Sequence, residues 1–364
     1  MPHARAVTAT GPSGARRLDT TRTVLGIALA AALVLAVAVL IAVRFDASVL
    51  VHAAPPWTDP GLTSGTLAVL PADHGFDGQF FYRLAIDPFS TAHTAAGITL
   101  DVPGMRLTRL GYPLLASTLS GGVESAVPWS LLTVNLLALV ALAMIGAELA
   151  RRSGLHRIWG LAFLLWPGFA YSLTHDLSEL VAAALVLGGL LAARAERTAW
   201  AAVLLTAAAL TRETTLLVAA GLVVAGCWQR WRRGGRTGPV GSGLVAGSAA
   251  IGGFAAAQVI GWIRLGELPI AATVRMNATG SQAGVWEALA NAVPVHSGSQ
   301  VLAVAALALL ATLLVVGVLG LWRSTATGGE KVAWLFAAGL LFTLNGNPWA
   351  EPKSFLRRPP SSAC

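Results

Sequence analysis

The chain has 364 residues, of which 55% are hydrophobic and only 12% are charged, and its mean hydropathy is +0.68. A soluble domain carries about 25% charged residues, so this composition excludes an ordinary water-soluble protein and predicts that most of the chain lies in a bilayer. The formal net charge of +8 belongs to the loops of such a protein, and nucleic acid is therefore not expected as a partner.

The N-terminal segment predicts a tail followed by a membrane anchor. Residues 1–22 are polar and carry four arginines, which is typical of a disordered cytoplasmic tail. Residues 23–43 form an uncharged run of 21 residues, enough for one span at about 1.5 Å per residue.

Residues 44–125 are too polar to lie in lipid and predict a large first outer loop, with a short interfacial helix over residues 80–85. Two further spans are expected at about residues 126–147 and 157–173.

The middle of the chain has unusually short apolar runs. Residues 180–193, 198–211 and 214–229 give uncharged runs of 14, 14 and 16 residues, whereas about 20 are needed to cross a bilayer. Either these helices are short or the charges between them lie within the membrane's thickness. Both cases indicate a functional pocket, because charge in a membrane needs surrounding protein or water.

The remaining segments complete an all-α polytopic membrane protein of about nine transmembrane helices, with a membrane domain over residues 23–346. We expect spans at residues 237–263, 299–322 and 332–346, a second outer loop at 264–298 and an outer tail at 347–364. With the N-terminus inside, cytoplasmic segments hold 15 Lys/Arg and 4 Asp/Glu, and outer segments hold 10 and 13. This asymmetry follows the positive-inside rule. Cys227 and Cys364 then lie on opposite sides, so no disulfide is expected.

Asp77 is the first candidate for chemistry. It precedes Gly78 and lies beside three aromatic residues; apolar surroundings disfavour the charged carboxylate, so we expect a raised pKa and a general base poised near neutral pH. Gly78 would let a ligand approach the backbone. The alternative is an interfacial helix that Asp77 caps.

Arg106 and Arg109 follow in the same loop. Their spacing places two guanidinium groups on one side of a helical turn, which suits a phosphate or pyrophosphate group. The alternative is pairing with Asp101 or with lipid headgroups.

Two further pairs fall on the predicted outer face. His175 and Asp176, with Glu179 beyond them, offer an imidazole and carboxylates, although Asp176 or Ser178 could instead cap the next helix. Arg212 and Glu213 separate two short runs, and they would either hold a lipid phosphate or neutralise each other.

Three motifs carry a resemblance. Residues 77–88 (Asp-Gly-Gln-Phe-Phe-Tyr-Arg-Leu-Ala-Ile-Asp-Pro), residues 106–116 (Arg-x-x-Arg-x-x-Tyr-Pro-Leu-Leu-Ala) and residues 210–214 (Leu-Thr-Arg-Glu-Thr) resemble bacterial multi-spanning proteins related to the C-type (GT-C) glycosyltransferase superfamily, mannosyltransferase-like. The resemblance implies a GT-C-like fold, a polyprenyl-phosphate sugar donor and an essential acidic residue in the first outer loop, which Asp77 matches.

The sequence departs from this superfamily at two places. Gln79 replaces the second acid of the paired-acid motif. The sequence therefore does not support a divalent metal, which stays an open alternative, and no other cofactor is predicted. The chain also ends soon after Arg357, where such proteins continue into further helices, and we therefore expect a truncated or frameshifted C-terminus.

The first hypothesis is an inverting hexosyltransferase of the plasma membrane that moves sugar from a polyprenyl-phosphate carrier to an acceptor on the outer face. Asp77 would be the catalytic base, arginines would stabilise the lipid phosphate, and aromatic rings would stack on sugar. The predicted partners are the lipid-linked donor and membrane lipids. The candidate substrate-binding residues are Gln79, Phe80, Phe81, Tyr82, Arg83, Arg106, Arg109, Tyr112, His175, Asp176, Arg212, Glu213 and Arg357.

The alternative is a transporter or flippase for a lipid-linked or anionic solute, which short broken helices also fit. The outer position of the richest motif and the absence of a convincing internal repeat favour the enzyme.

Overall fold

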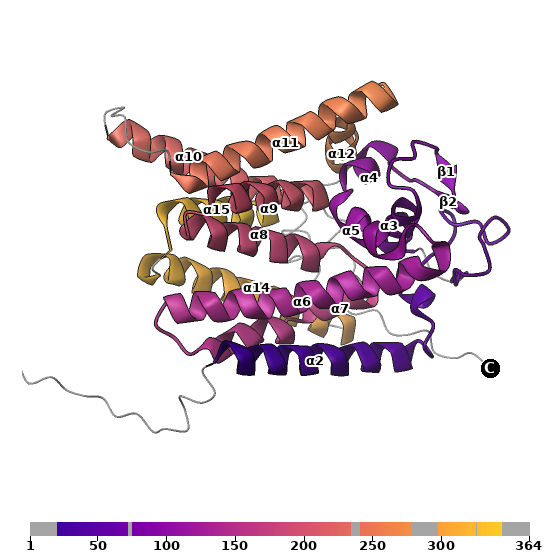
Figure 1. Ribbon diagram of the computed structural model, residues 1–364, viewed down its shortest axis with the longest axis horizontal. Coiled ribbons are helices and arrows are strands. Elements are labelled where there is room, and N and C mark those ends of the chain that lie inside the picture. The colour runs from indigo at the N-terminus through magenta and orange to yellow at the C-terminus, as the bar shows by residue number, and fades with distance from the viewer. Residues whose placement is uncertain (1–19, 72–74, 234–240, 279–297, 325, 344–364) are drawn as a thin grey trace, which may run out of the picture.

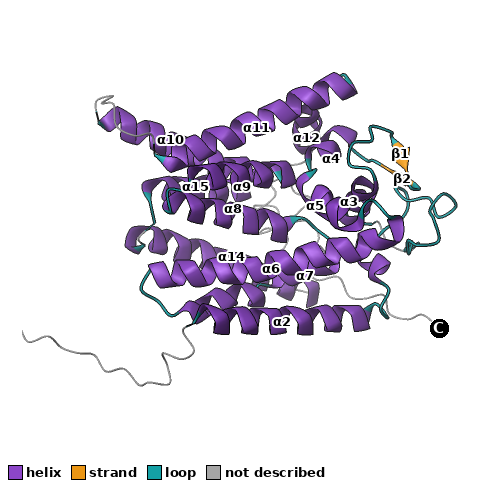
Figure 2. Cartoon of the chain, viewed as in Figure 1, coloured by secondary structure: helices purple, strands orange, loops and turns teal. Residues whose placement is uncertain are grey.

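The computed structural model describes residues 20–71, 75–233, 241–278, 298–324 and 326–343, and it is mostly helical (Figure 2). Most of the predicted N-terminal tail, part of the second outer loop and the whole outer tail, with Arg357 and Cys364, lie outside these ranges.

The longer helices lie side by side, and the elements of the first loop gather at one end of them (Figure 1). Helix α9 packs on α8 and α11, helix α10 packs on α11 and α15, and α6 packs on α2 and α8. The long and medium helices are α2 (Thr21–Ala42), α6 (Val127–Arg152), α8 (Glu179–Arg194), α9 (Thr198–Thr211), α10 (Leu216–Arg232), α11 (Ser242–Leu265), α14 (Gly298–Arg323) and α15 (Gly328–Thr343).

The first loop is folded into short helices and a two-stranded hairpin. Its two-stranded hairpin pairs Thr94 with Thr99 and Ala95 with Ile98. The short elements of the chain are η1 (Ala47–Val51), α3 (Asp77–Ile86), β1 (Thr94–Ala95), β2 (Ile98–Thr99), α4 (Pro103–Thr108), α5 (Gly111–Ser120), η2 (Glu124–Ala126), η3 (Arg157–Leu165), α7 (Pro167–Thr174), η4 (Glu213–Thr215) and α12 (Pro269–Ala278).

Three helices in the described ranges are long and apolar enough to cross a membrane: Thr21–Ala42, Glu124–Arg152 and Ser242–Leu265. This is fewer than the nine spans that hydropathy predicts. The helices α8, α9 and α10 do form as separate units of 16, 14 and 17 residues, which confirms that the middle helices are short.

The predicted span at residues 157–173 is not one helix. It divides into the 3₁₀ helix η3 and the α-helix α7, with Trp166 extended between them at φ −74° and ψ 116°. Pro167 explains the break, because proline lacks the backbone N–H and disfavours helical geometry in the residue before it.

Small residues let the helices approach closely. A Cβ on Gly221 of α10 would lie 2.4 Å from the Cα of Ala333 on α15, and one on Gly247 of α11 would lie 2.6 Å from the carbonyl oxygen of Ala219. Helix contacts through small residues are typical of packing within membranes.

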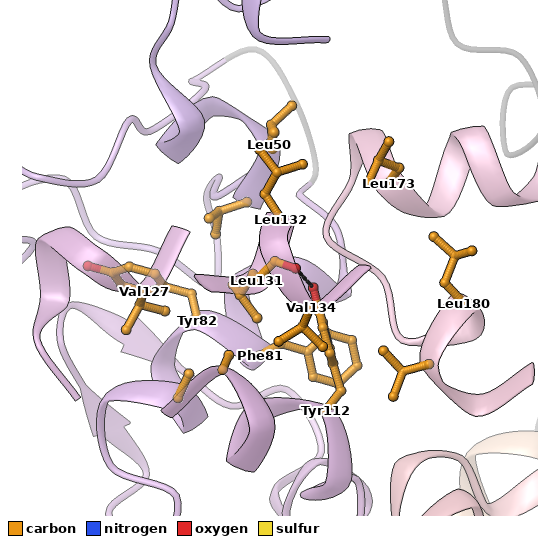
Figure 3. Packing of buried hydrophobic residues seen from close by; sticks show 14 of the residues in the cluster. Leu50, Phe81, Tyr82, Tyr112, Val127, Leu131, Leu132, Val134, Leu173 and Leu180 are labelled. Atoms are coloured by element: carbon orange, nitrogen blue, oxygen red, sulfur yellow. Dashed lines mark hydrogen bonds between the residues drawn. The ribbon is translucent and has the colours of Figure 1, made fainter. Parts of the chain in front are cut away.

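The main core lies where the first loop meets α6. Phe81 and Tyr112 pack edge to face with their ring centroids 5.4 Å apart, and both are fully buried (Figure 3). The Tyr112 hydroxyl donates to the Leu131 carbonyl at 3.0 Å and accepts from the Asn135 amide at 2.8 Å. These contacts fix α3 and α5 against α6 and so position the start of α3.

Candidate functional site

Asp77 is the first residue of α3 and lies between two arginines. Its Oδ1 is 2.8 Å from Arg106 Nη1, and its Oδ2 is 3.3 Å from Arg109 Nη1. The Asp77 side chain is 32% exposed, whereas those of Arg106 and Arg109 are nearly buried. Asp77 does not act as a cap, because the N-cap residue is Phe76 and no side chain caps this helix.

Each arginine also holds a second carboxylate. Arg106 donates to both oxygens of Asp101 at 2.7 Å, which confirms the alternative pairing predicted for it. Arg109 donates through Nε to Glu213 at 2.8 Å and through Nη2 to the other oxygen. The two guanidinium groups therefore lie on the same side, as their spacing predicts; they meet at Asp77, which was not predicted, and each also holds another carboxylate.

Arg212 does not pair with its neighbour Glu213. Its Nη1 forms an ion pair with Glu179 at the start of α8, and Glu179 also accepts from the Ser172 hydroxyl at 3.3 Å. The backbone at Arg212 is extended, with φ −153° and ψ 116°, and successive side chains of an extended segment point in opposite directions. The predicted mutual neutralisation is thus wrong.

The resulting network joins Asp77, Asp101, Glu179 and Glu213 with Arg106, Arg109 and Arg212. Burial acts to raise the pKa of Asp77, but the three guanidinium groups outweigh it and hold this pKa below its ordinary value. The predicted raised pKa is therefore wrong: Asp77 is an ionised carboxylate at neutral pH.

A stack of rings lies beside this network. His175 stacks on Tyr171 with ring centroids 4.0 Å apart and on His52 at 4.2 Å, while Phe76 meets it edge-on at 4.6 Å. His52, Phe76 and Tyr171 are half-buried. The stack therefore joins the end of η1, the residue before Asp77 and the C-terminal end of α7.

Gly78 is required by the protein's own backbone rather than by a ligand. A Cβ there would lie 2.7 Å from the carbonyl oxygens of both His175 and Val51. The expectation that Gly78 opens the backbone to a ligand is therefore wrong, because this space is already filled.

Other predicted substrate-binding residues of α3 belong to the core. Phe80, Phe81 and Tyr82 are buried, and the Phe80 ring lies under the Arg106 guanidinium with its centroid 4.1 Å away. None of these rings presents an exposed face for stacking on a sugar. The predicted stacking role is contradicted, because the helix turns its aromatic residues inward rather than toward a membrane interface.

Gln79, Arg83 and Tyr112 are also structural in this geometry. The Gln79 side-chain oxygen accepts from the Thr58 hydroxyl at 2.8 Å and from the Ala54 amide at 3.3 Å. Arg83 is buried and donates to the Ala92 carbonyl. These contacts brace the first loop, and they place the three side chains away from the Asp77 carboxylate.

Asp176 is fully buried and has a left-handed backbone, with φ +47°. Neither of its carboxylate oxygens has a hydrogen-bond partner in the described part of the chain, and burial raises the pKa of this carboxyl well above its ordinary value. The predicted capping role is not observed, because Ser178 is the N-cap of α8 and no side chain caps it.

Two features of the site were not predicted. His52 and Tyr171 join His175 in the ring stack; Tyr171 is only four residues before His175, whereas His52 is distant in the sequence. The sequence signal that could have indicated them is that each is a polar aromatic residue next to apolar residues. Among the described residues, no group of three or more His, Cys, Asp and Glu side chains is placed to hold a metal ion.

No protein-family model, curated protein or solved structure matches this chain.

Proposed function

We propose that the chain is a multi-pass plasma-membrane protein with a cytoplasmic N-terminus and the Asp77 end facing outward. Exposed tryptophans support this placement. Trp228 and Trp231 mark the end of α10, while Trp129 and Trp262 lie near the opposite ends of α6 and α11. Tryptophan is enriched at both membrane interfaces, and the positive-inside rule gives the orientation.

We infer that the protein is an inverting hexosyltransferase with a GT-C-like fold, which uses a polyprenyl-phosphate sugar donor at the outer face. The observation that carries this proposal is the partly exposed, ionised Asp77 between Arg106 and Arg109. A carboxylate can take a proton from an acceptor hydroxyl, and guanidinium groups stabilise a departing phosphate.

In the proposed reaction the acceptor oxygen attacks the anomeric carbon as Asp77 takes its proton. The bond from that carbon to the phosphate oxygen breaks, and the lipid phosphate leaves with the electron pair. A phosphate approaching Arg106 and Arg109 would replace Asp77 as their partner. Because those guanidinium groups hold the pKa of Asp77 down, losing them makes Asp77 a stronger base when the donor is bound.

The ring stack supports the same proposal. Sugars bind well to aromatic faces that are partly open, and His52, Phe76 and Tyr171 are half-buried beside Asp77. They take the role that the sequence assigned to Phe80, Phe81 and Tyr82, which are buried.

The test is transfer of radiolabelled sugar from polyprenyl-phosphate donors in membranes that contain the wild type, Asp77→Asn or Asp87→Asn. Asp87 is the exposed C-cap residue of the same helix and contacts none of the three arginines. We expect Asp77→Asn to abolish transfer at equal membrane abundance, because an amide cannot accept the proton, and Asp87→Asn to retain it.

The transporter is the alternative outcome of this test. The ion pair from Arg212 to Glu179 ties the end of α9 to the start of α8, and a solute carrier could exchange such pairs during its cycle. The transporter replaces the enzyme if wild-type membranes bind the donor without transferring sugar and if the protein, placed in proteoliposomes, moves the donor across their bilayer.

A further inference from the structure

A cavity lies at the opposite end of the helices from Asp77. It has a volume of about 510 Å³ and lies between the end of α8, the end of α10, the start of α11 and the start of α15. Helix α8 begins at Glu179 in the Asp77 network and ends at Arg194 on this cavity. Its 16 residues separate the two sites by about 24 Å.

One wall of the cavity is already neutral. Arg194 and Glu330 form a bidentate ion pair there, with Arg194 Nη2 2.7 Å from Glu330 Oε2. Glu330 also accepts from the Thr327 amide at 2.7 Å and from its hydroxyl at 3.0 Å. This acid is therefore fully occupied and does not oppose an incoming anion.

The opposite wall is basic. Arg230 and Arg233 line the cavity from the end of α10, and neither forms an ion pair within the described ranges. Glu196 is the one further acid on the lining. Two arginines against one free acid leave the cavity positive.

The start of α11 adds donors to the same cavity. Gly241, Ser242 and Gly243 all line it, and no side chain caps this helix. The first N–H groups of a helix have no partner within the helix, and together with its dipole they favour an anion.

Two observations point to a lipid rather than a soluble anion. Trp228 and Trp231 are 50% and 69% exposed at the same end of α10, which places the cavity at headgroup depth. Part of its lining is aliphatic, with Leu190, Leu222 and Leu244 beside the arginines. Such a mixed lining matches a phosphate group with an acyl chain attached.

We propose that this cavity binds the headgroup phosphate of an anionic phospholipid from the inner leaflet, with Arg230, Arg233 and the first amides of α11 as its ligands. Basic pockets between helices on the cytoplasmic side are suited to such headgroups. The site is independent of Asp77 and of sugar transfer, and it depends only on the membrane placement.

Gly241 offers a test that does not endanger the fold. It is the N-cap residue of α11 with φ −61° and ψ 139°, and an added Cβ would meet nothing within 4 Å. Aspartate and asparagine are both favoured at such a position. Gly241→Asp would therefore cap the helix while its negative charge repels a phosphate, and Gly241→Asn would cap it without charge.

The experiment is native mass spectrometry of the purified full chain with equal amounts of dioleoyl phosphatidylglycerol and dioleoyl phosphatidylcholine. We expect the wild type to retain phosphatidylglycerol selectively, Gly241→Asn to retain it more weakly, because its side chain occupies an amide of α11 without adding charge, and Gly241→Asp to lose it. Substituting both Arg230 and Arg233 by glutamine should weaken binding roughly 25-fold, at about fivefold for each basic group.

The matched control replaces Arg151 and Arg152 by glutamine, because they lie at the end of α6, away from the cavity, and remove the same charge. Selective binding that survives Gly241→Asp, or equal retention of both lipids, would overturn the proposal. Selective uptake of millimolar inorganic phosphate without lipid preference would also overturn it, in favour of a soluble anion.

Discussion

The pair of Arg109 and Glu213 provides the sharpest test of the site's geometry. Their side chains are 10% and 11% exposed, and the guanidinium donates to both carboxylate oxygens. Glu213→Gln removes the negative charge of this side chain. Of the two carboxylates that pair with Arg109, it leaves Asp77, at 3.3 Å. Breaking a buried ion pair costs about 3–5 kcal/mol, and we expect the lower end of that range because Asp77 remains.

The measurement is the free energy of unfolding from reversible titration of the purified protein with a denaturing detergent. The matched control is Glu148→Gln, because Glu148 pairs with Arg151 and Arg152 but the side chains of this cluster are 30–44% exposed. Exposed pairs contribute little, so this variant should unfold almost as the wild type does.

A double variant separates the ion pair from the space it fills. Arg109→Met with Glu213→Leu removes both charges, and replacing a buried ion pair by apolar groups is often close to neutral. It should therefore be more stable than Glu213→Gln alone. If Glu213→Gln unfolds like Glu148→Gln, the buried network is not formed as described and the reasoning fails.

Three further predictions concern stability. Asp176→Asn should raise the free energy of unfolding at neutral pH by about 1–3 kcal/mol. Because burial raises the pKa of Asp176 in the folded state, the stability of the wild type falls as the pH rises above about 3.8, the ordinary pKa of this carboxyl. The variant should lose this pH dependence. A slope that persists in the variant would contradict the burial argument. Gly78→Ala should cost about 1–3 kcal/mol in the same titration, because its Cβ meets two carbonyl oxygens; unchanged stability would show that the neighbours can move. Tyr112→Phe should cost about 1–2 kcal/mol, because it leaves the Leu131 carbonyl and the Asn135 amide without the hydroxyl; a neutral result would mean that water replaces it.

Hydropathy predicted the positions of helices whose bounds depend on the residues nearby in the sequence. The three short middle helices begin and end within a few residues of the uncharged runs that predicted them, because charge placement ends an apolar helix. Pro167 could also have predicted the break between η3 and α7, since its effect on Trp166 is local; the apolar run concealed it.

Partners across long sequence separations could not be predicted. Arg109 and Glu213 are 104 residues apart, and nothing local distinguishes that pair from Arg212 with Glu213. The burial of Phe80, Phe81 and Tyr82 has the same origin: a helix with aromatic residues can face lipid, solvent or protein, and the choice is made by α5 and α6 packing against it. The reversed direction of the Asp77 pKa follows, because it depends on three arginines that converge only in the fold.

The balance of charge in the Asp77 network links its structure to the proposed chemistry. Asp77, Asp101, Glu179 and Glu213 give four negative charges against three from Arg106, Arg109 and Arg212, so the network carries one excess negative charge. An anionic donor adds to this excess and binds only if it displaces a carboxylate from the arginines. Asp77 is the carboxylate to be displaced from Arg106 and Arg109, because it is more exposed than their other partners, Asp101 and Glu213, and its contact with Arg109 is longer than that of Glu213. Once displaced, Asp77 takes the proton of the acceptor hydroxyl and becomes neutral. The network therefore loses its excess negative charge in the same step that releases the lipid phosphate.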